Sequence, residues 1–320
     1  MKKIAFLTSG GDAPGMNAAI RSIVKTCLHF QITPYAIYDG FQGMIEGRGK
    51  LMDENDVDNC IQLGGTIIGT ARSKEFLTLE GRVKAIEFLK KEEIDGLIVI
   101  GGDGTFAGAM LLGKEMNVPI IGIPGTIDND INGTDFTIGF DTALNTVISS
   151  IDKIRDTASS HHRVFLVEVM GKDAGSLAID SALCSGTEIV LIPEEPTDIQ
   201  KLIQQIQYNI NLKKATIVIV AEGDDAGNST LILEKLRPYF QETSICQTIL
   251  GHIQRGGSPS AKDRLLATTM GNFAVNAIIE GKTNKMVASL NSQIVLQDLS
   301  EIGKSYNEFN DKLRLLSEFE

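Results

Sequence analysis

The sequence has no tryptophan, few other aromatic residues and few histidines, and these absences exclude several classes of protein. Aromatic residues make up 6% of the 320 residues, so the chain has little with which to stack single-stranded nucleic acid. The four histidines and four cysteines are scattered without a C-x-x-C pair, so no zinc-ligand pattern is present. Thirty basic against forty-one acidic residues give a net charge of −11, which argues against nonspecific binding to nucleic acid or acidic membranes.

The chain also lacks long apolar runs and low-complexity segments. No run approaches the length of a membrane span, and the apolar stretch 4–7 is too short for the core of a signal peptide. The isolated cysteines suggest a reducing compartment, so we expect a cytoplasmic protein. The hydrophobic fraction of 42% is that of an ordinary globular protein and excludes disorder.

Thirty-two glycines and only eight prolines suit an α/β protein with many tight turns between strands and helices. Short apolar runs alternate with amphipathic stretches, as in βα units around a parallel sheet. The pattern restarts in the second half, so we predict two doubly wound parallel-sheet lobes, with a break near Thr137–Asp141 and a return after Gly256. The predicted lobes are residues 1–138 with about 256–305, and about 139–255 with 306–320.

Some elements are predicted within narrow limits. Residues 4–7, 97–100 and 120–123 are short apolar runs followed by polar or glycine-rich segments, which is typical of buried strands. Residues 261–279 have the pattern of a long helix, and residues 285–296 that of a hairpin that turns at Asn291-Ser292.

Three loops of unusual composition follow predicted strands. They are TSGGDAPGMN at 8–17, GGDGT at 101–105 and PGTIDND at 124–130. In an open parallel sheet, ligands bind beyond the carboxyl ends of the strands. Glycines let backbone amides approach an anion there, and a helix start offers free N–H groups. The second loop is not a P-loop because no Gly-Lys-Ser/Thr follows.

Each loop also has a purely structural interpretation. The first loop would serve as a tight βα turn, and Asp103 in the second would serve as a helix N-cap. The third loop, if extended, places Thr126, Asp128 and Asp130 on one side. One carboxylate would then accept a proton from a hydroxyl nucleophile while the other serves a metal, as phosphoryl transfer needs. A solvated acidic turn is the alternative.

Together these segments resemble the bacterial ATP-dependent 6-phosphofructokinases. The matching segments are TSGGDAPGMNAAIR (8–21), GGDGT (101–105), PGTIDNDINGTD (124–135), IGFDTA (138–143), DTASSHHR (156–163), EVMG (168–171) and LGHIQRGGSP (250–259). The similarity extends from residue 2 to beyond residue 280. It implies two α/β lobes with the active site in the cleft between them, in a homotetramer. The implied reaction is phosphorylation of fructose 6-phosphate at its 1-hydroxyl, in glycolysis, with ATP as co-substrate and Mg²⁺ as cofactor.

The resemblance also assigns roles position by position. For ATP it implies Gly11, Arg72, Ser73, Gly102, Asp103, Gly104 and Thr105, with Asp103 serving magnesium. For catalysis it implies Asp128 as the base, with Arg72, Thr126, Asp130 and Lys172. For the sugar phosphate it implies Thr126, Ile127, Asp128, Met170, Gly171, Lys172, Glu222, His252, Ile253, Gln254 and Arg255, and Arg163 from a neighbouring subunit.

Two positions indicate the phosphoryl donor. Pyrophosphate-using relatives carry an aspartate where this chain has Gly104 and a lysine where it has Gly125. A small residue leaves room for the α-phosphate of a nucleotide, so we expect ATP as donor.

The chain departs from the family pattern at its sugar-phosphate positions. Cys246 stands where the family has an arginine that crosses the subunit interface, and Lys172 replaces another arginine. A charge-assisted bond to phosphate contributes roughly 1.5–3 kcal/mol. We therefore expect the affinity for fructose 6-phosphate to be about 10- to 100-fold weaker.

The effector positions are altered as well. Those that match ADP or phosphoenolpyruvate ligands are Arg21, Lys25, Arg155, Gly186, Glu188, Lys213 and Lys214. Glu54, Asn211 and Ala215, however, replace an arginine, a lysine and a histidine of the family. A carboxylate beside a bound phosphate repels it, so we expect weak or absent allosteric control.

Two rival functions remain at this point. One is a kinase for another sugar phosphate, such as tagatose 6-phosphate, and the other is a catalytically weak paralogue that regulates a partner. The aspartates of the third loop argue against the second, because a binding module needs no base. A lipid or NAD kinase that shares only GGDG is disfavoured by the PGTIDND and GHIQRGG segments.

Overall fold

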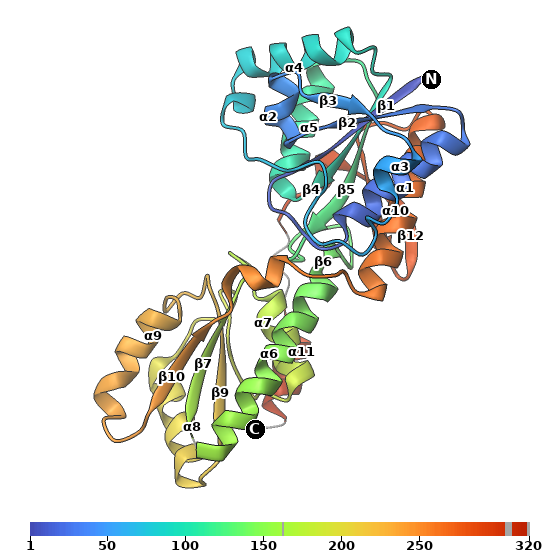
Figure 1. Cartoon of the computed structure of the whole chain (residues 1–320). Coiled ribbons are helices and arrows are strands. Elements are labelled where there is room, and N and C mark those ends of the chain that lie inside the picture. The colour runs from blue at the N-terminus through green and yellow to red at the C-terminus, as the bar shows by residue number, and fades with distance from the viewer. Residues whose placement is uncertain (162, 305–308, 319–320) are drawn as a thin grey trace. The chain divides into compact units, whose positions relative to one another are not determined.

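The computed structural model describes residues 1–161, 163–304 and 309–318, and the chain divides into two units (Figure 1). Unit 1 consists of Met1–Ile127, Ile131–Thr142 and Arg255–Ser305, and unit 2 of Asp128–Asp130, Ala143–Gln254 and Tyr306–Glu320. The chain passes from unit 1 into unit 2 near the start of one long helix, and it returns at Arg255.

Unit 1 is built on an eight-stranded sheet whose order is β12-β11-β5-β4-β1-β2-β3, with β6 beside β5. The strands are β1 Lys3–Ser9, β2 Thr33–Ile37, β3 Gly49–Leu51, β4 Gly96–Gly101, β5 Ile120–Thr126, β6 Ile138–Gly139, β11 Lys285–Leu290 and β12 Gln293–Asp298. Only β3 and β12, at the two edges, pair antiparallel with their neighbours. The central strands are fully buried, which is why they consist of continuous apolar runs.

Helices cover both faces of this sheet (Figure 1). The helices are α1 Met16–His29, α2 Gly40–Ile45, α3 Glu54–Val57, α4 Leu79–Lys91, α5 Asp103–Glu115 and α10 Ala261–Ile279, with 3₁₀ turns η1 Glu75–Leu77 and η4 Leu299–Glu301. α1 and α10 pack so closely that a Cβ at Gly271 would lie 2.8 Å from the carbonyl oxygen of Ala19. Residues of α2, α4 and α5 form one core with the Ala5 and Leu7 face of β1.

Unit 2 contains a four-stranded, all-parallel sheet of order β10-β7-β9-β8. Its strands are β7 Val164–Val169, β8 Ile189–Leu191, β9 Thr216–Ala221 and β10 Ile245–Ile249. Its helices are α6 Phe140–His161, α7 Ser176–Ser185, α8 Ile199–Asn211, α9 Ser229–Leu236 and α11 Asn310–Ser317, with 3₁₀ turns η2 Arg237–Tyr239 and η3 Gly251–Arg255. The core under α8 and α9 includes Leu202, Ile206, Ile232 and Leu236.

The α/β class with parallel sheets is confirmed, and so are the helix at 261–279 and the hairpin. Asn291 and Ser292 adopt φ values of 50° and 64°, as a tight hairpin turn requires. The elements that we did not predict include α2, β3 and α7. α2 and β3 are too short for a periodic pattern, and the apolar sequence of α7 has little amphipathic contrast. No helix in the described residues has both the length and the apolar character needed to cross a bilayer.

Candidate active site

The three glycine-rich or acidic loops of the sequence begin at the same edge of the unit 1 sheet. Ser9, which ends β1, pairs with Gly101, which ends β4, and Gly101 pairs with Pro124 near the end of β5. Connections from β1 and β4 run in opposite directions along the sheet, so these two strands form its topological switch point. Open parallel sheets bind ligands at such a point.

The second loop presents the amino end of α5. Gly102 is the N-cap and Asp103 is the first helical residue, so the alternative in which Asp103 caps the helix is wrong. Asp103 and Gly104 are exposed, and the first amides of a helix have no partner within the helix. This end of α5 therefore combines free N–H groups with an accessible carboxylate, which suits a phosphate chain with a cation.

Hydroxyl groups join the first loop to its neighbours. Thr105 donates from Oγ1 to the carbonyl oxygen of Ser9 at 3.0 Å, and Thr70 donates to that of Gly10 at 3.0 Å. A Cβ at Gly101 would lie 2.3 Å from Thr105 Oγ1, so only glycine permits this contact. These bonds hold the first loop, the second loop and the segment before Arg72 in one arrangement.

Arg72 and Ser73 are both predicted to bind ATP, but only the side chain of Arg72 is available to a ligand. Arg72 is exposed, whereas Ser73 donates from Oγ to Gln42 Oε1 at 2.6 Å and accepts the amide of Phe76 at 3.1 Å. The Ser73 hydroxyl therefore serves the local fold, and only its backbone remains for a ligand. The sequence patterns did not single out Gln42, because nothing in its local sequence distinguishes it.

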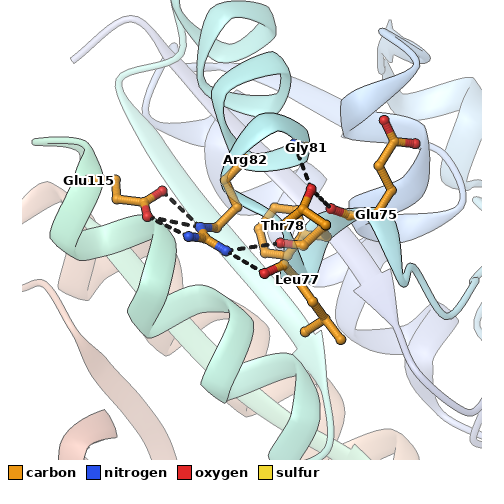
Figure 2. A network of polar contacts seen from close by, with 7 residues as sticks. Glu75, Leu77, Thr78, Gly81, Arg82 and Glu115 are labelled. Atoms are coloured by element: carbon orange, nitrogen blue, oxygen red, sulfur yellow. Dashed lines mark hydrogen bonds and ion pairs between the residues drawn. The ribbon is translucent and has the colours of Figure 1, made fainter.

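Figure 2 shows a second network, which holds the turn after Ser73. Arg82 on α4 donates from Nε to both carboxylate oxygens of Glu115 at 2.9 Å, and from Nη1 to the carbonyl oxygen of Leu77 at 2.9 Å. Thr78 caps α4 by accepting the amide of Gly81 at 3.1 Å. Because Glu115 ends the helix that Asp103 begins, Arg82 connects the two segments that carry Arg72 and Asp103.

The third loop is not extended along its whole length. β5 ends at Thr126, the chain bends at Ile127 and Asp128, and Asn129 adopts a left-handed conformation with φ of 49°. The condition for the period-two argument is therefore not met at Thr126, Asp128 and Asp130, and that argument does not place them on one side. An asparagine tolerates this conformation better than most residues, so the sequence permits the turn that follows the strand.

The residues of the third loop differ in their exposure to solvent. Thr126, Ile127 and Asp130 are buried, and Asp128 is partly exposed. The carbonyl oxygen of Thr126 accepts a hydrogen bond from Thr137 Oγ1 at 2.7 Å. Asp128 therefore has the more accessible of the two carboxyl groups, as a proton acceptor from a substrate must.

The two glycines that indicate the phosphoryl donor have different surroundings. A Cβ at Gly104 would meet nothing within 4 Å, whereas one at Gly125 would lie 3.1 Å from both Ile100 Cγ2 and Met16 Cε. Gly104 thus borders open space at the start of α5, and Gly125 is a packed position in β5. Only Gly104 leaves space for a ligand directly.

Unit 2 gathers a separate set of predicted residues at the carboxyl edge of its own sheet. Val169 pairs with Ala221 and Glu168 with Ile249, so the loops after β7, β9 and β10 begin side by side. These loops carry Met170, Gly171, Lys172, Glu222, His252, Ile253 and Gln254.

Backbone geometry joins two of these loops. Lys172 donates its amide to Glu222 Oε1 at 2.9 Å, with a left-handed φ of 55°. Gly171 has φ of +143°, and a Cβ there would lie 2.3 Å from the carbonyl oxygen of Ala174. A Cβ at Gly223 would lie 1.9 Å from that of Lys172. The β7 loop and the β9 loop can pack together in this way only with glycine at both positions.

The GHIQR segment divides into exposed and buried residues. His252 and Ile253 are exposed, whereas Gln254 is fully buried, accepts the amide of Met170 at 3.2 Å and donates to the carbonyl oxygen of Gly251 at 2.9 Å. The side chain of Gln254 is therefore committed to the fold and does not offer its amide to a ligand. Arg255 belongs to unit 1, where it donates to the carbonyl oxygen of Asp12 at 3.1 Å.

Two predicted positions lie at the opposite edge of the unit 2 sheet. Arg163 directly precedes β7, and Cys246 is the second residue of β10, whose first residue pairs with Val164. At about 3.3 Å per residue, Cys246 lies about 13 Å along the strand from Leu250, where the sugar-binding loops begin. Arg163 and Cys246 thus lie near one another and far from the GHIQR turn of their own chain.

The effector positions fall into two groups, one on each unit. On unit 1, Lys25 Nζ lies 2.8 Å from Glu54 Oε1, which raises the pKa of Lys25, and 3.6 Å from Asp58 Oδ1. Arg21 also lies on α1. The charge of Lys25 is therefore paired with the carboxylate of Glu54.

On unit 2, Arg155, Gly186, Glu188 and Lys214 line a cavity of about 340 Å³, which Ala215 also borders. Arg155 donates from Nη2 to the carbonyl oxygen of Ser185 at 2.7 Å and to Thr187 Oγ1 at 3.0 Å. Lys213 is a left-handed turn residue with φ of 55°.

The protein groups that would hold a magnesium ion are sparse but suitable. No group of three His, Cys, Asp or Glu side chains within the described residues is arranged to hold a metal. Mg²⁺ is commonly held by one or two carboxylates together with substrate phosphates. The exposed Asp103 carboxylate beside the helix amides fits that mode of binding.

Helix amides and an accessible carboxylate at the switch point of a parallel sheet, in a chain that also carries a candidate proton acceptor in the loop after β5, are the parts of a phosphoryl-transfer enzyme. The chain belongs to the phosphofructokinase family, because the sequence model of the family described as Phosphofructokinase matches residues 3–278.

Individual relatives agree with this assignment. The chain is 48% identical over 319 residues to "ATP-dependent 6-phosphofructokinase 1" of Thermus thermophilus, covering 99% of each chain. It is 51% identical over 303 residues to the ATP-dependent 6-phosphofructokinase of Halalkalibacterium halodurans, covering 94% of each.

Solved structures share the fold. Phosphofructokinase of Pichia pastoris in the T-state matches with a TM-score of 0.87 at 39% identity, over 94% of this chain and 35% of that one. This chain thus spans about a third of the Pichia chain. The pyrophosphate-dependent phosphofructokinase of Marinobacter aquaeolei matches with a TM-score of 0.88 at 21% identity, over 99% and 91%, and shows the fold alone.

Proposed function

We propose that this chain is an ATP-dependent 6-phosphofructokinase, which phosphorylates D-fructose 6-phosphate at its 1-hydroxyl to give fructose 1,6-bisphosphate in glycolysis. The observation that carries the proposal is the amino end of α5, with the exposed Asp103, at the β1/β4 switch point. The names of relatives about 48% identical over the whole chain support the same activity.

The residues of unit 1 bind and orient the donor. The amides at the start of α5 and the glycines of the first loop hold phosphate oxygens, and Arg72 adds an always-charged, planar donor group. A bound Mg²⁺, held by Asp103 and the phosphates, would neutralise the charge that develops on them. Phosphoryl transfer needs little covalent help, so positioning and these positive groups supply most of the catalysis.

Asp128 is the proton acceptor in this proposal. As the 1-hydroxyl oxygen forms its bond to the γ-phosphorus, the bond from that phosphorus to the β,γ-bridging oxygen breaks. The hydroxyl proton moves to the Asp128 carboxylate, and ADP leaves with the bridging oxygen. Thr126 and Asp130 position the loop, and their burial supports that role.

The loops of unit 2 bind fructose 6-phosphate. Glu222, held by the Lys172 amide, accepts hydrogen bonds from sugar hydroxyls, while His252 and the amide of Gly171 approach the sugar and its phosphate. Lys172 supplies a point charge at an arginine position of the family. It forms fewer directed bonds to phosphate than an arginine would.

ATP is the donor that the site favours over pyrophosphate. The open space beside Gly104 can hold the α-phosphate and the rest of the nucleotide. An aspartate there would extend into that space and repel a phosphate.

The proposal includes a homotetramer, and the positions of Arg163 and Cys246 support it. Both lie at the sheet edge away from the sugar-binding loops of their own chain. A residue there reaches a sugar phosphate only in a neighbouring subunit, so the proposed site is complete only in an oligomer. Cys246 offers no charge to that phosphate.

Weak control by ADP or phosphoenolpyruvate is also part of the proposal. Its support is the ion pair between Lys25 and Glu54, which neutralises an effector cation. A fructose 6-phosphate saturation curve that is hyperbolic and unchanged by phosphoenolpyruvate is expected, and strong sigmoidal inhibition would contradict it. A cytoplasmic location is supported by the four free cysteines.

The decisive experiment measures initial rates with fructose 6-phosphate up to tens of millimolar, with Mg·ATP or Mg·pyrophosphate as donor. Turnover with ATP alone, at a high KM for the sugar phosphate, supports the proposal, and the weak affinity agrees with the uncharged Cys246. Turnover with tagatose 6-phosphate alone would make the chain a kinase for another sugar phosphate. Binding of ATP without turnover of either sugar would favour the regulatory paralogue.

A further inference from the structure

The segment after β8 contacts both loops of unit 2 that carry the proposed sugar-phosphate residues. Glu194 accepts the amide of Gly175 with Oε1 at 2.8 Å and with Oε2 at 3.1 Å. Gly175 is the N-cap of α7, and it follows the loop that contains Met170, Gly171 and Lys172. The carboxylate of Glu194 thus fixes the point where this loop becomes a helix.

Three residues further along, the same segment holds the other loop. Thr197 donates from Oγ1 to Asp224 Oδ2 at 2.9 Å, and its amide donates to Asp225 Oδ1 at 2.9 Å. Asp224 Oδ1 in turn accepts the amide of Ala226 at 3.0 Å. Glu222 lies two residues before Asp224, so Thr197 fixes the loop that presents Glu222.

Packing shows that these contacts are closely fitted. A Cβ at Gly175 would lie 2.6 Å from both Glu194 Oε2 and Ile192 Cβ, so only glycine can sit against this carboxylate. Asp224 is 5% exposed. Burial raises the pKa of Glu194 and of Asp224, because each carboxyl group is withdrawn from water.

The two loops are also joined directly, because Lys172 donates its amide to Glu222. The β7 loop, the β9 loop and the 194–197 segment therefore form a closed set of contacts. A shift of either loop would therefore strain one or more of these hydrogen bonds.

We propose that Glu194 and Thr197 are positioning residues for fructose 6-phosphate, which hold the Met170–Lys172 loop and the Glu222 loop in their binding geometry. Neither residue touches the sugar in this proposal, which rests on the function proposed above. Glu194 acts through Gly175, and Thr197 acts through Asp224. We name this pair of contacts the loop brace.

The test compares Glu194→Ala and Glu194→Gln with the wild type, and uses Glu195→Gln as the control, because Glu195 is an exposed neighbouring carboxylate outside these contacts. We expect Glu194→Ala to raise the KM for fructose 6-phosphate about tenfold, because small misplacements of binding groups are costly. The kcat and the KM for ATP should stay within about twofold, since the nucleotide loops belong to unit 1. Glu194→Gln keeps one acceptor oxygen, so its KM for fructose 6-phosphate should lie between those of the wild type and Glu194→Ala. The KM of Glu195→Gln should match that of the wild type.

A second measurement separates the brace from the reaction. Amide hydrogen exchange should become faster in residues 170–175 of Glu194→Ala, with the unfolding midpoint of the whole chain nearly unchanged. Thr197→Val should produce the same effect in residues 222–228.

An unchanged KM with unchanged exchange would overturn the proposal. A parallel loss in kcat, in both KM values and in the unfolding midpoint would overturn it too, because it would show only a general structural role. If the wild type does not phosphorylate fructose 6-phosphate at all, the proposed function fails. The exchange measurement on the same proteins then still decides whether Glu194 holds the loop.

Discussion

Two contacts from each unit show a difference in how side chains meet the backbone of the functional loops. In unit 1, hydroxyls donate to carbonyl oxygens, as Thr105 does to Ser9 and Thr8 does to Gly69. In unit 2, carboxylates accept amides, as Glu222 does from Lys172 and Glu194 does from Gly175. A loop that receives a phosphate chain must keep its amides free and its potential positive, so neutral supports suit it. The sugar loops use carboxylates that consume amides to fix their shape.

The cysteines of the two units provide the largest expected contrast. Cys27 and Cys60 of unit 1 are buried, whereas Cys184 of unit 2 is exposed. Burial raises the pKa of Cys27 to about 12, so at pH 8 only about one thiol in 10⁴ is ionised. Iodoacetamide should therefore label Cys184 more than about 10³-fold faster than Cys27, as followed by peptide mass spectrometry.

The matched control for the labelling is the unfolded chain, in which both cysteines should react at similar rates. Labelling of Cys27 in the native protein at a rate near that of Cys184 would contradict the buried position of α1 against α10.

The second prediction concerns the third loop, in which Asp128–Asp130 belongs to unit 2 although the residues on either side belong to unit 1. Asp128→Asn should lower kcat by about 10³-fold, because an amide cannot accept the proton of the 1-hydroxyl. Binding of ATP should persist, since residues 101–105 are unaffected. Asp152→Asn, at an exposed position of α6, is the control and should keep full activity. A loss below tenfold would remove Asp128 from the role of base and favour a binding module.

The third prediction tests the missing cation of unit 2. Cys246→Arg should lower the KM for fructose 6-phosphate by about 10- to 100-fold, because a charge-assisted bond to phosphate is restored. Cys184→Arg adds the same charge at an exposed site and should leave the KM unchanged. Steady-state kinetics at fixed saturating ATP would distinguish them. Equal effects of the two variants would show that the charge acts through the overall field instead of at the site.

The smallest expected effect comes from a matched pair of glycine substitutions. Gly171→Ala should lower the free energy of unfolding by about 1–3 kcal/mol, because φ is +143° and the new Cβ would lie 2.3 Å from the carbonyl oxygen of Ala174. Gly104→Ala lies in the first turn of α5 with open space around it, and it should change stability by less than about 1 kcal/mol. Denaturant unfolding of both variants measures the difference, and equal losses would mean that the loop of unit 2 is no more constrained than that of unit 1.

Much of the fold follows from local patterns that the sequence displays. The strands at 97–100 and 120–123 lie within β4 and β5, and the helix at 261–279 coincides with α10, because burial and periodicity are visible in a short window. The left-handed Asn129, which ends the extended conformation of the third loop, has no such signal. The same holds for Gln42 and Glu194, whose partners are distant in the chain or lie in another loop.

The sequence by itself determined the α/β class, the glycine-rich loops at the ends of strands and the family, because each depends on residues that are neighbours along the chain. Only the tertiary structure decided that Gln254 is a buried support instead of a free ligand group, and that Glu54 pairs with Lys25. It also decided that Glu194 and Thr197 form hydrogen bonds with two different loops. Hydrogen bonds and ion pairs between distant segments form only when the sheet brings those segments together, and no local pattern records which segments will meet.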